Sequence, residues 1–209
     1  MSNKKNRKLF KYFKRFFDIL CALLGVIVLI FISIIIKLSM LLIGDKDTIF
    51  FKQERTGLNG KKFELIKFRS MKITNDVRDT SKEDEFTKIG LFIRKTSLDE
   101  LPQVINILRG EMSFIGPRPW IPEYYENMTK KQRKRVSVLP GITGLAQVNG
   151  RNGLSVIDKI NYDLEYVNNY SFLQDLKIII KTIKTIFSKE DAYTDKIGIQ
   201  NEIEVLKNQ

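Results

Sequence analysis

The chain has no histidine among its 209 residues and a single cysteine, Cys21. The absence of histidine excludes acid–base catalysis by an imidazole, Ser-His-Asp triads and most zinc sites. One cysteine cannot form a disulfide within the chain or a cysteine-cluster metal site. Any chemistry must therefore be carried by carboxylates, arginines and a hard cation held by oxygen atoms, such as Mg²⁺.

Acidic residues are outnumbered by basic ones, 24 against 36, which gives a formal net charge of +12. Such a charge favours anionic partners: nucleic acid, phospholipid headgroups or phosphorylated substrates. Hydrophobic residues make up 43% of the chain, which is enough for a core. Length and composition indicate one domain, or one domain with an anchor.

A long uncharged run near the N-terminus predicts a membrane helix. Residues 19–36 contain no charged side chain, and as a helix they would extend over about 27 Å, which is long enough to be a transmembrane candidate. The run has no polar face, unlike a helix on a soluble core. A signal peptide would have a shorter apolar region, followed by small residues at a cleavage site. We expect residues 1–44 to form a basic N-terminus and this helix.

The charges around the run leave its path open. Seven basic residues precede Asp18, and eight more lie between Lys46 and Lys72. Because basic flanks favour the cytoplasm, both ends prefer the same side of the membrane. A helix that bends in the bilayer and returns would satisfy both, and Ser33 could assist by bonding back to a carbonyl. The segment has no proline, so a bend has no strong local cause. Spanning and re-entrant paths both stay open.

Two short segments predict a β-hairpin. Residues 49–55 and 61–69 have strand character, and the Asn-Gly pair between them is a hairpin turn signal. The second strand would place Lys67 and Arg69 on one face. Both cations are candidates for binding phosphate. The alternative, favoured for an isolated hairpin, is an edge strand protected by its charges.

Helical periodicity covers three segments of the body. Residues 98–108 end at Gly110, a C-cap signal. Residues 154–167 and 173–187 carry apolar side chains at helical spacing. The last segment has lysines on its opposite side. Such a helix either packs on the core, which is the simpler expectation, or lies in a membrane interface.

These elements define the expected fold class, α+β. A mainly helical cytoplasmic domain over residues 45–190, with one small β-hairpin, would follow the membrane helix, and amphipathic helices would lie at the interface. The polar residues 74–88 are expected to form a mobile loop or a surface helix. Residues 191–209 are expected to form a loose polar tail.

The most informative motif is a pair of adjacent carboxylates, Asp99 and Glu100, at the expected start of a helix. Taken alone it favours capping, since Ser97 and Glu100 fit a capping box and Asp99 could itself be the N-cap. The functional interpretation uses the same place, because a helix N-terminus attracts phosphate. There Asp99 would be an ionised nucleophile, and Glu100 could hold Mg²⁺ against a diphosphate.

Three arginines could neutralise phosphate charge: Arg94 before the pair, Arg118 between two prolines, and Arg151 after a glycine-rich segment. The prolines stiffen the backbone at Arg118, which suits a phosphate or carboxylate partner. A buried structural salt bridge is an equal alternative. The glycine-rich segment lacks the ending of a P-loop. The basic run at 130–135 is typical of a solvated helix face, or of a contact with anionic headgroups.

Five runs, in order, resemble the bacterial sugar transferases, and especially the small monotopic polyprenyl-phosphate phosphoglycosyl transferases. They are residues 50–57 (FFKQERTG), 67–71 (KFRSM), 96–103 (TSLDELPQ), 112–119 (MSFIGPRP), and 140–144 (PGITG) through to the Gly-Arg at 150–151. Each run is weak alone. Five in family order are highly specific, and they cover most of the chain.

The resemblance implies a reaction. A UDP-sugar would donate a phospho-sugar to undecaprenyl phosphate and release UMP, as the first membrane step of capsule, O-antigen, exopolysaccharide or N-glycan synthesis. Asp99 would be the nucleophile and carry the covalent phospho-sugar, while Glu100 would bind Mg²⁺. Arg94, Arg118 and Arg151 would bind the phosphates and the nucleotide.

The resemblance also implies surroundings for the site. Asp175 matches a further acid of the family. The helix would be re-entrant, with the catalytic domain on the cytoplasmic face of the inner membrane, although Ser33-Ile34 departs from the usual Ser-Pro of the family. The expected partners are a UDP-sugar, undecaprenyl phosphate and membrane lipid, with no nucleic acid. The sugar and the oligomeric state stay open.

A second hypothesis is a membrane-anchored basic protein that binds anionic lipid or nucleic acid without catalysis. The net charge of +12 supports it. Against it, the cations are dispersed among loops with glycine and proline, and aromatic side chains interleaved for base stacking are not evident.

Overall fold

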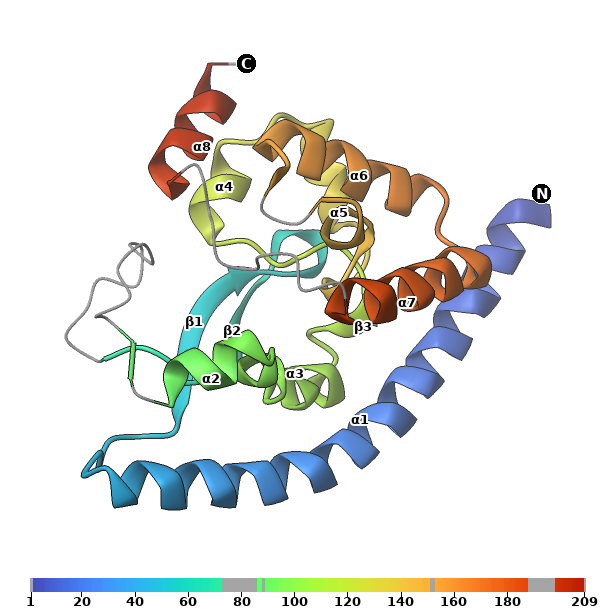
Figure 1. Cartoon of the computed structure of the whole chain (residues 1–209). Coiled ribbons are helices and arrows are strands. Elements are labelled where there is room, and N and C mark those ends of the chain that lie inside the picture. The colour runs from blue at the N-terminus through green and yellow to red at the C-terminus, as the bar shows by residue number, and fades with distance from the viewer. Residues whose placement is uncertain (1, 73–85, 88, 151–152, 188–197, 209) are drawn as a thin grey trace.

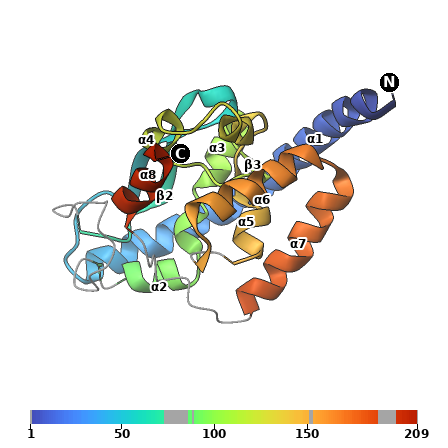
Figure 2. The same cartoon turned by 90° about the horizontal axis from the view of Figure 1, so that it is seen from above.

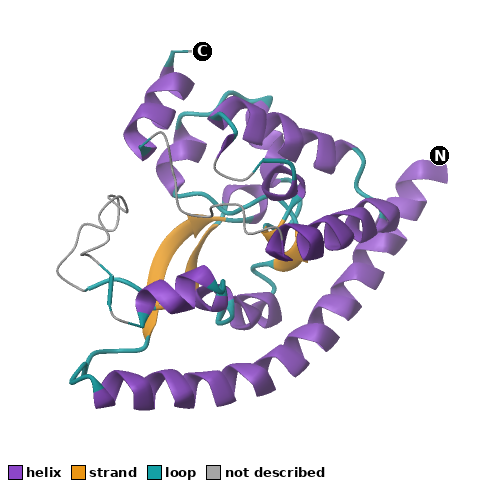
Figure 3. Ribbon diagram, viewed as in Figure 1, coloured by secondary structure: helices purple, strands orange, loops and turns teal. Residues whose placement is uncertain are grey.

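The computed structural model describes residues 2–72, 86–87, 89–150, 153–187 and 198–208. Helices make up most of it, and its strands are short (Figure 3). The expected α+β class is confirmed. The expected loop or surface helix at 74–88 lies outside the described residues, except for Phe86 and Thr87.

The N-terminal part is one continuous helix, α1 (Ser2–Leu42). Its stretch Leu9–Leu42 is long and apolar enough to cross a membrane, by length and composition. Figure 1 shows α1 bending smoothly, with the rest of the chain on the inner side of the bend. A gradual curve of this kind requires no proline. In Figure 2 the helix runs across the whole body and projects beyond it at the N-terminal end.

One face of α1 packs on the body and the opposite face is bare. The buried positions recur every four or seven residues, as one helix face requires: Asp18, Ala22, Leu29, Ile36 and Met40. Large apolar side chains point outward and are more than half exposed, including Leu24, Phe31, Ile35 and Leu38. A contiguous apolar surface of this extent marks a contact with a membrane or a protein.

Strands β1 (Phe50–Thr56) and β2 (Lys62–Phe68) form the predicted antiparallel hairpin. In the turn between them Asn59 and Gly60 have positive φ angles of 55° and 82°. Asparagine and glycine tolerate this backbone region best. The Asn-Gly signal in the sequence therefore identified the turn correctly.

Helix α2 (Gly90–Lys95), the 3₁₀ turn η3 (Leu98–Glu100) and helix α3 (Gln103–Arg109) follow the hairpin. Helix α3 ends at Gly110 with a φ of 81°, which confirms the predicted C-cap. Its inner face joins the main core, where Val104 and Ile107 pack with the buried side of α1.

A buried amide joins α3 to the open edge of β2. Asn106 is fully buried. Its Oδ1 accepts a hydrogen bond from Ile66 N at 3.1 Å, and its Nδ2 donates to Glu64 O at 2.7 Å. The side chain thus pairs with β2 as a neighbouring strand would. Helix α3 is held against the hairpin on one side and against α1 on the other.

A second sheet was not predicted: β3 (Ser113–Ile115) lies parallel to β4 (Gly141–Thr143). Two glycines allow the backbones to approach. A Cβ on Gly141 would lie 2.1 Å from Gly116 N, and one on Gly116 would lie 2.3 Å from Leu139 O. The glycine-rich segment therefore has a packing role at this position.

The body also contains α4 (Pro122–Glu126), the 3₁₀ turn η4 (Gln132–Val136), α5 (Leu145–Val148), α6 (Val156–Asn168) and α7 (Phe172–Phe187). Helices α6 and α7 confirm the two predicted from periodicity. The expectation that α7 packs its apolar side on the core is wrong. Asp175 and Ile178 are buried, but Phe172, Leu173 and Ile183 are more than half exposed.

The expected loose tail is also wrong for its described part, which contains helix α8 (Ile199–Lys207). Ile203 and Leu206 are buried in a cluster with residues of α4 and α6. Glu202 accepts hydrogen bonds from Tyr124 OH and from Lys159 Nζ. The tail is polar in composition, yet its few apolar residues lie on one helix face and pack against apolar side chains of α4 and α6.

We expect Ile203→Ala to lower the free energy of unfolding by about 2–4 kcal/mol, because it removes a fully buried apolar side chain. Val205→Ala, on the exposed side of the same helix, should change it by less than about 0.5 kcal/mol. Urea unfolding of the full chain in detergent, followed by circular dichroism, measures both. Equal effects of the two substitutions would show that α8 is not packed.

Candidate active site

Asp99 and Glu100 lie in the turn η3, between α2 and α3. Ser97 begins this turn in the left-handed region, with a φ of 56°, and its side chain caps no backbone group. Helix α3 has Pro102 at its N-cap position. The capping interpretation is therefore wrong for both carboxylates, and their charges are free for other partners. A left-handed non-glycine residue is often found at functional sites.

Cations from two other elements meet the pair. Lys67, in β2, places its Nζ 3.1 Å from Glu100 Oε1 and 3.5 Å from Asp99 Oδ2. Arg118, in the loop after β3, donates from Nη2 to Glu100 Oε1 at 2.7 Å. Lys67 thus has a specific partner, so the edge-strand alternative does not account for it.

The two carboxylates differ in their electrostatic environment. Burial raises the pKa of Asp99, Lys67 opposes this shift, and the neighbouring Glu100 reinforces it. Burial also acts to raise the pKa of Glu100, but Arg118 and Lys67 outweigh it and hold that pKa well below its usual range. Glu100 is thus a fixed anion, whereas the charge on Asp99 is less well stabilised.

Arg94, in α2, is the third predicted cation near the pair. Its guanidinium stacks over the Phe86 ring, 5.2 Å from the centroid. From there its charge opposes the rise in the pKa of Asp99 that burial causes. Arg151 lies outside the described residues. The structure therefore brings four of the proposed site residues around Asp99: Glu100, Lys67, Arg94 and Arg118.

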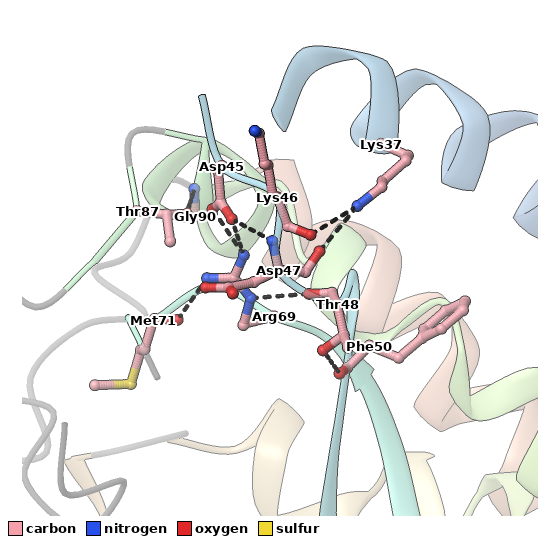
Figure 4. A network of polar contacts seen from close by, with 10 residues as sticks. All are labelled: Lys37, Asp45, Lys46, Asp47, Thr48, Phe50, Arg69, Met71, Thr87 and Gly90. Carbon is pink, nitrogen blue, oxygen red and sulfur yellow. Dashed lines mark hydrogen bonds and ion pairs between the residues drawn. The ribbon is translucent and has the colours of Figure 1, made fainter. Parts of the chain in front are cut away.

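Arg69 does not join this site, contrary to the prediction. It lies just beyond the end of β2 and is 6% exposed. Its Nη2 contacts both carboxylate oxygens of Asp45 at 2.7 Å, and its Nε donates to Thr48 O at 2.9 Å (Figure 4). Lys37 donates to Asp47 O at 2.9 Å in the same network. Arg69 therefore joins the end of α1 to the hairpin.

Asp175 has structural partners as well. Its carboxylate forms an ion pair with Lys14 of α1 and accepts a hydrogen bond from Tyr166 OH at 2.7 Å. Burial raises the pKa of Tyr166, and Asp175 adds to that shift, so the phenol remains a donor. Asp175 connects α7 to α1 and α6, and its described contacts do not include the carboxylate pair.

Three residues at or near the site were missed. Arg55, at the end of β1, and Gln103, one helical turn after Glu100, line a pocket together with Lys67 and Arg118. Both lie inside the recognised runs, but only the hairpin register and the fold of η3 show that they converge. Arg135 was missed because it belongs to the basic run at 130–135, and such a run predicts a solvated surface.

Arg135 contacts the backbone of Arg118. It is 2% exposed, and its Nη2 donates to Arg118 O at 2.8 Å and to Asp163 Oδ2 at 2.6 Å. Its guanidinium lies 3.9 Å from the Trp120 ring centroid. The buried ion pair with Asp163 leaves Arg135 one orientation. It therefore holds the backbone that carries Arg118.

Fold and site together define a class of protein: an α+β domain on a long apolar helix, with a carboxylate pair among lysine and arginine side chains. The sequence model of the bacterial sugar transferase family matches residues 9–189. The chain belongs to that family, as its five motifs predicted. Family membership favours an enzyme over a non-catalytic basic binding protein.

Individual relatives agree with this assignment. The chain is 44% identical to the uncharacterized sugar transferase EpsL of Bacillus subtilis, over 85% of this chain and 88% of that protein. It is 35% identical to the exopolysaccharide production protein ExoY of Sinorhizobium fredii, over 86% and 88%. A UDP-glucose:undecaprenyl-phosphate glucose-1-phosphate transferase of Xanthomonas campestris is 40% identical over 69% of this chain, which spans 33% of that longer protein.

We expect Asp99→Asn to stabilise the folded chain at neutral pH. A carboxyl with a raised pKa adds stability in its protonated form, below its usual pKa of 3.8, and that stability is lost as pH rises through the raised pKa. A neutral amide avoids the loss. The melting temperature of the variant should therefore exceed that of the wild type at neutral pH, and the difference should vanish near about pH 4 and below.

Glu100→Gln is the matched control, because this substitution should change the melting temperature at neutral pH in the opposite direction. The pKa of Glu100 is lowered, so its ionised form adds stability above its usual pKa of 4.5. This variant should melt below the wild type at neutral pH. Melting curves of both variants across pH 4–8, in one detergent, make the comparison. A destabilised Asp99→Asn variant at neutral pH would contradict the assigned environment.

Proposed function

We propose that this protein is a phosphoglycosyl transferase, which moves a phospho-sugar from a UDP-sugar to undecaprenyl phosphate and releases UMP. The names of relatives such as the Xanthomonas campestris enzyme support this substrate pair. The observation that carries the proposal is the division of roles within the carboxylate pair. Two cations hold Glu100, whereas Asp99 has one weak partner among the described residues, Lys67 at 3.5 Å.

The proposed reaction has two displacements at phosphorus. An Asp99 oxygen attacks the phosphorus that carries the sugar, the bond from this phosphorus to the bridging oxygen breaks, and UMP leaves with that oxygen. An aspartyl phospho-sugar remains. An oxygen of undecaprenyl phosphate then attacks the same phosphorus and the bond to Asp99 breaks. The product is undecaprenyl-diphosphate-sugar, and the carboxylate is regenerated.

The surrounding cations have defined tasks in this scheme. Lys67 and Arg118 neutralise Glu100, and their positive charges lie beside the place where charge develops on the phosphate oxygens. The positive charge of Arg94 favours the ionised form of Asp99. The low pKa of Glu100 keeps this residue ionised while Asp99 reacts. Arg151 remains the proposed nucleotide-binding arginine.

Mg²⁺ is the proposed cofactor, with Glu100 as its ligand. No group of three or more acidic, histidine or cysteine side chains that could hold a metal is found in the described part of the chain. Mg²⁺ does not require one, because it is commonly bound by one or two carboxylates and by substrate phosphates. The adjacent pair fits that mode. Bound Mg²⁺ would neutralise phosphate charge.

A re-entrant α1 on the cytoplasmic side of the inner membrane is part of the proposal. The packed stripe of α1 extends from Asp18 to Met40. A helix standing upright across the bilayer would draw the attached body, with its polar loops, into the hydrocarbon region. A bent helix lying with its bare face in the membrane avoids this cost. The exposed apolar face of α7 would contact the same surface.

The proposal predicts that the wild-type chain releases at most one equivalent of UMP from a UDP-sugar alone, and releases UMP continuously once undecaprenyl phosphate is present. Asp99→Asn should reduce turnover by at least about 10³-fold and abolish the covalent phospho-sugar adduct. A luminescent UMP assay across a panel of UDP-sugars, with mass spectrometry of the intact protein, measures both. Glu54→Gln, which removes an exposed carboxylate from β1, is the control. Release of UDP instead of UMP would overturn the proposal.

Removal of divalent cations should stop the reaction. Excess EDTA is expected to abolish UMP release, and added Mg²⁺ should restore it. Glu100→Gln should raise the Mg²⁺ concentration for half-maximal activity about tenfold or more, since one metal ligand is lost. Titration of Mg²⁺ against initial rate tests this. Full activity in excess EDTA would contradict the assigned metal.

A further inference from the structure

A small pocket opens beside Glu100, at the meeting point of β1, β2, α3 and the loop after β3. Its lining residues are Arg55, Leu65, Lys67, Gln103, Arg118 and Pro119. Lys67 and Arg118 are already engaged with Glu100. Arg55 and Gln103 have no role in the proposed reaction so far, although their side chains border the same space.

Gln103 is the more unusual of the two. It is 2% exposed, yet its Nε2 has no hydrogen-bond partner among the residues that the structure describes. Buried amide groups nearly always have partners, because an unpaired donor loses its bonds to water without compensation. A polar side chain in this state at the wall of a pocket indicates a ligand with an acceptor atom.

Arg55 is a partly buried cation that forms no ion pair with a carboxylate among the described residues. Its Nε has no partner within the described part of the chain, its Nη1 is 3.5 Å from Pro119 O, and its Nη2 donates to Gln53. Burial and the nearby charge of Arg118 lower the pKa of Arg55 to about 10. Both effects would be relieved by an anion in the pocket.

The local charge balance points the same way. Four cations, Arg55, Lys67, Arg94 and Arg118, stand against two carboxylates, Asp99 and Glu100, and Lys67 contacts both carboxylates. Positive charge is therefore in excess at the site, and Arg55 is the pocket-lining cation that neither carboxylate contacts. Arginine and amide donors together suit an anion with several acceptor oxygens, as in a phosphate group.

We propose that Arg55 and Gln103 form a phosphate-binding subsite beside the carboxylate pair. The assignment of a substrate to it rests on the proposed function, in which phosphate is present both in the diphosphate of the donor and in the lipid acceptor. Arg55 Nε and the Gln103 amide bind phosphate oxygens and hold this group in place while Asp99 attacks or is released.

The first test uses inorganic pyrophosphate and the full chain in detergent. Pyrophosphate should raise the melting temperature of the wild type, because it binds the folded state alone. Arg55→Met and Gln103→Leu should lose most of this shift. Lys52→Met removes an exposed cation from the same strand, and Gln132→Leu removes a buried but hydrogen-bonded glutamine. Both controls should keep the shift.

Melting without ligand separates binding from folding. Gln103→Leu removes an unpaired amide, so its melting temperature should equal or exceed that of the wild type. Gln132→Leu should melt lower, since its Oε1 accepts hydrogen bonds from Thr129. A stable Gln103→Leu variant that no longer responds to pyrophosphate is the result expected of a binding residue.

Kinetics then identify the source of the phosphate. If the subsite binds the donor, both variants should raise KM for the UDP-sugar about tenfold or more and leave KM for undecaprenyl phosphate unchanged. If it binds the acceptor, the two effects should be exchanged. A wild type that releases no UMP would refute the proposed function, while the pyrophosphate comparison would still decide the subsite. Unchanged pyrophosphate shifts and both KM values within twofold of wild type would overturn the subsite.

Discussion

The site depends on one interaction, the shared binding of Glu100 by Lys67 and Arg118. It joins the strand β2, the turn η3 and the loop after β3, which are far apart in the sequence. Two cations hold Glu100, whereas burial raises the pKa of the adjacent Asp99, whose one contact with a cation in the described part of the chain is Lys67 at 3.5 Å. The two neighbouring carboxylates therefore differ in their contacts: Lys67 and Arg118 bind Glu100 at 3.1 and 2.7 Å, whereas Lys67 lies 3.5 Å from Asp99. Arg135 maintains this difference by holding the backbone at Arg118.

Helix α3 connects α1 to the carboxylate pair, so that the position of one depends on the position of the other. It follows the carboxylate pair directly, packs Val104 and Ile107 against α1, and bonds to the edge of β2 through Asn106. Movement of α1 relative to β2 would therefore disturb the pair. The clusters around Arg69 and Asp175 secure α1 near its two ends. Both were predicted as substrate-binding residues, and both instead hold the helix on the body.

Local signals predicted the local structure well. The Asn-Gly turn, the cap at Gly110 and the periodicity of α6 and α7 depend on residues close in the chain, and all were found as expected. The parallel pairing of β3 with β4 and the packing of α8 depend on distant partners, and neither was foreseen. The same limit explains the missed Arg55 and Gln103: nothing in their neighbours shows that β1 and α3 meet at one pocket.

The sequence by itself determined the kinds of chemistry and the family. Without histidine, and with one cysteine, only carboxylates, cations and a hard metal ion were available, and the five ordered motifs identified a bacterial sugar transferase. Only the tertiary structure decided which cations serve the carboxylates. Lys67 and Arg69 are two positions apart in the sequence, yet Lys67 contacts Asp99 and Glu100 while Arg69 is bound by Asp45. Charge acts through distance in space, and folding alone sets that distance.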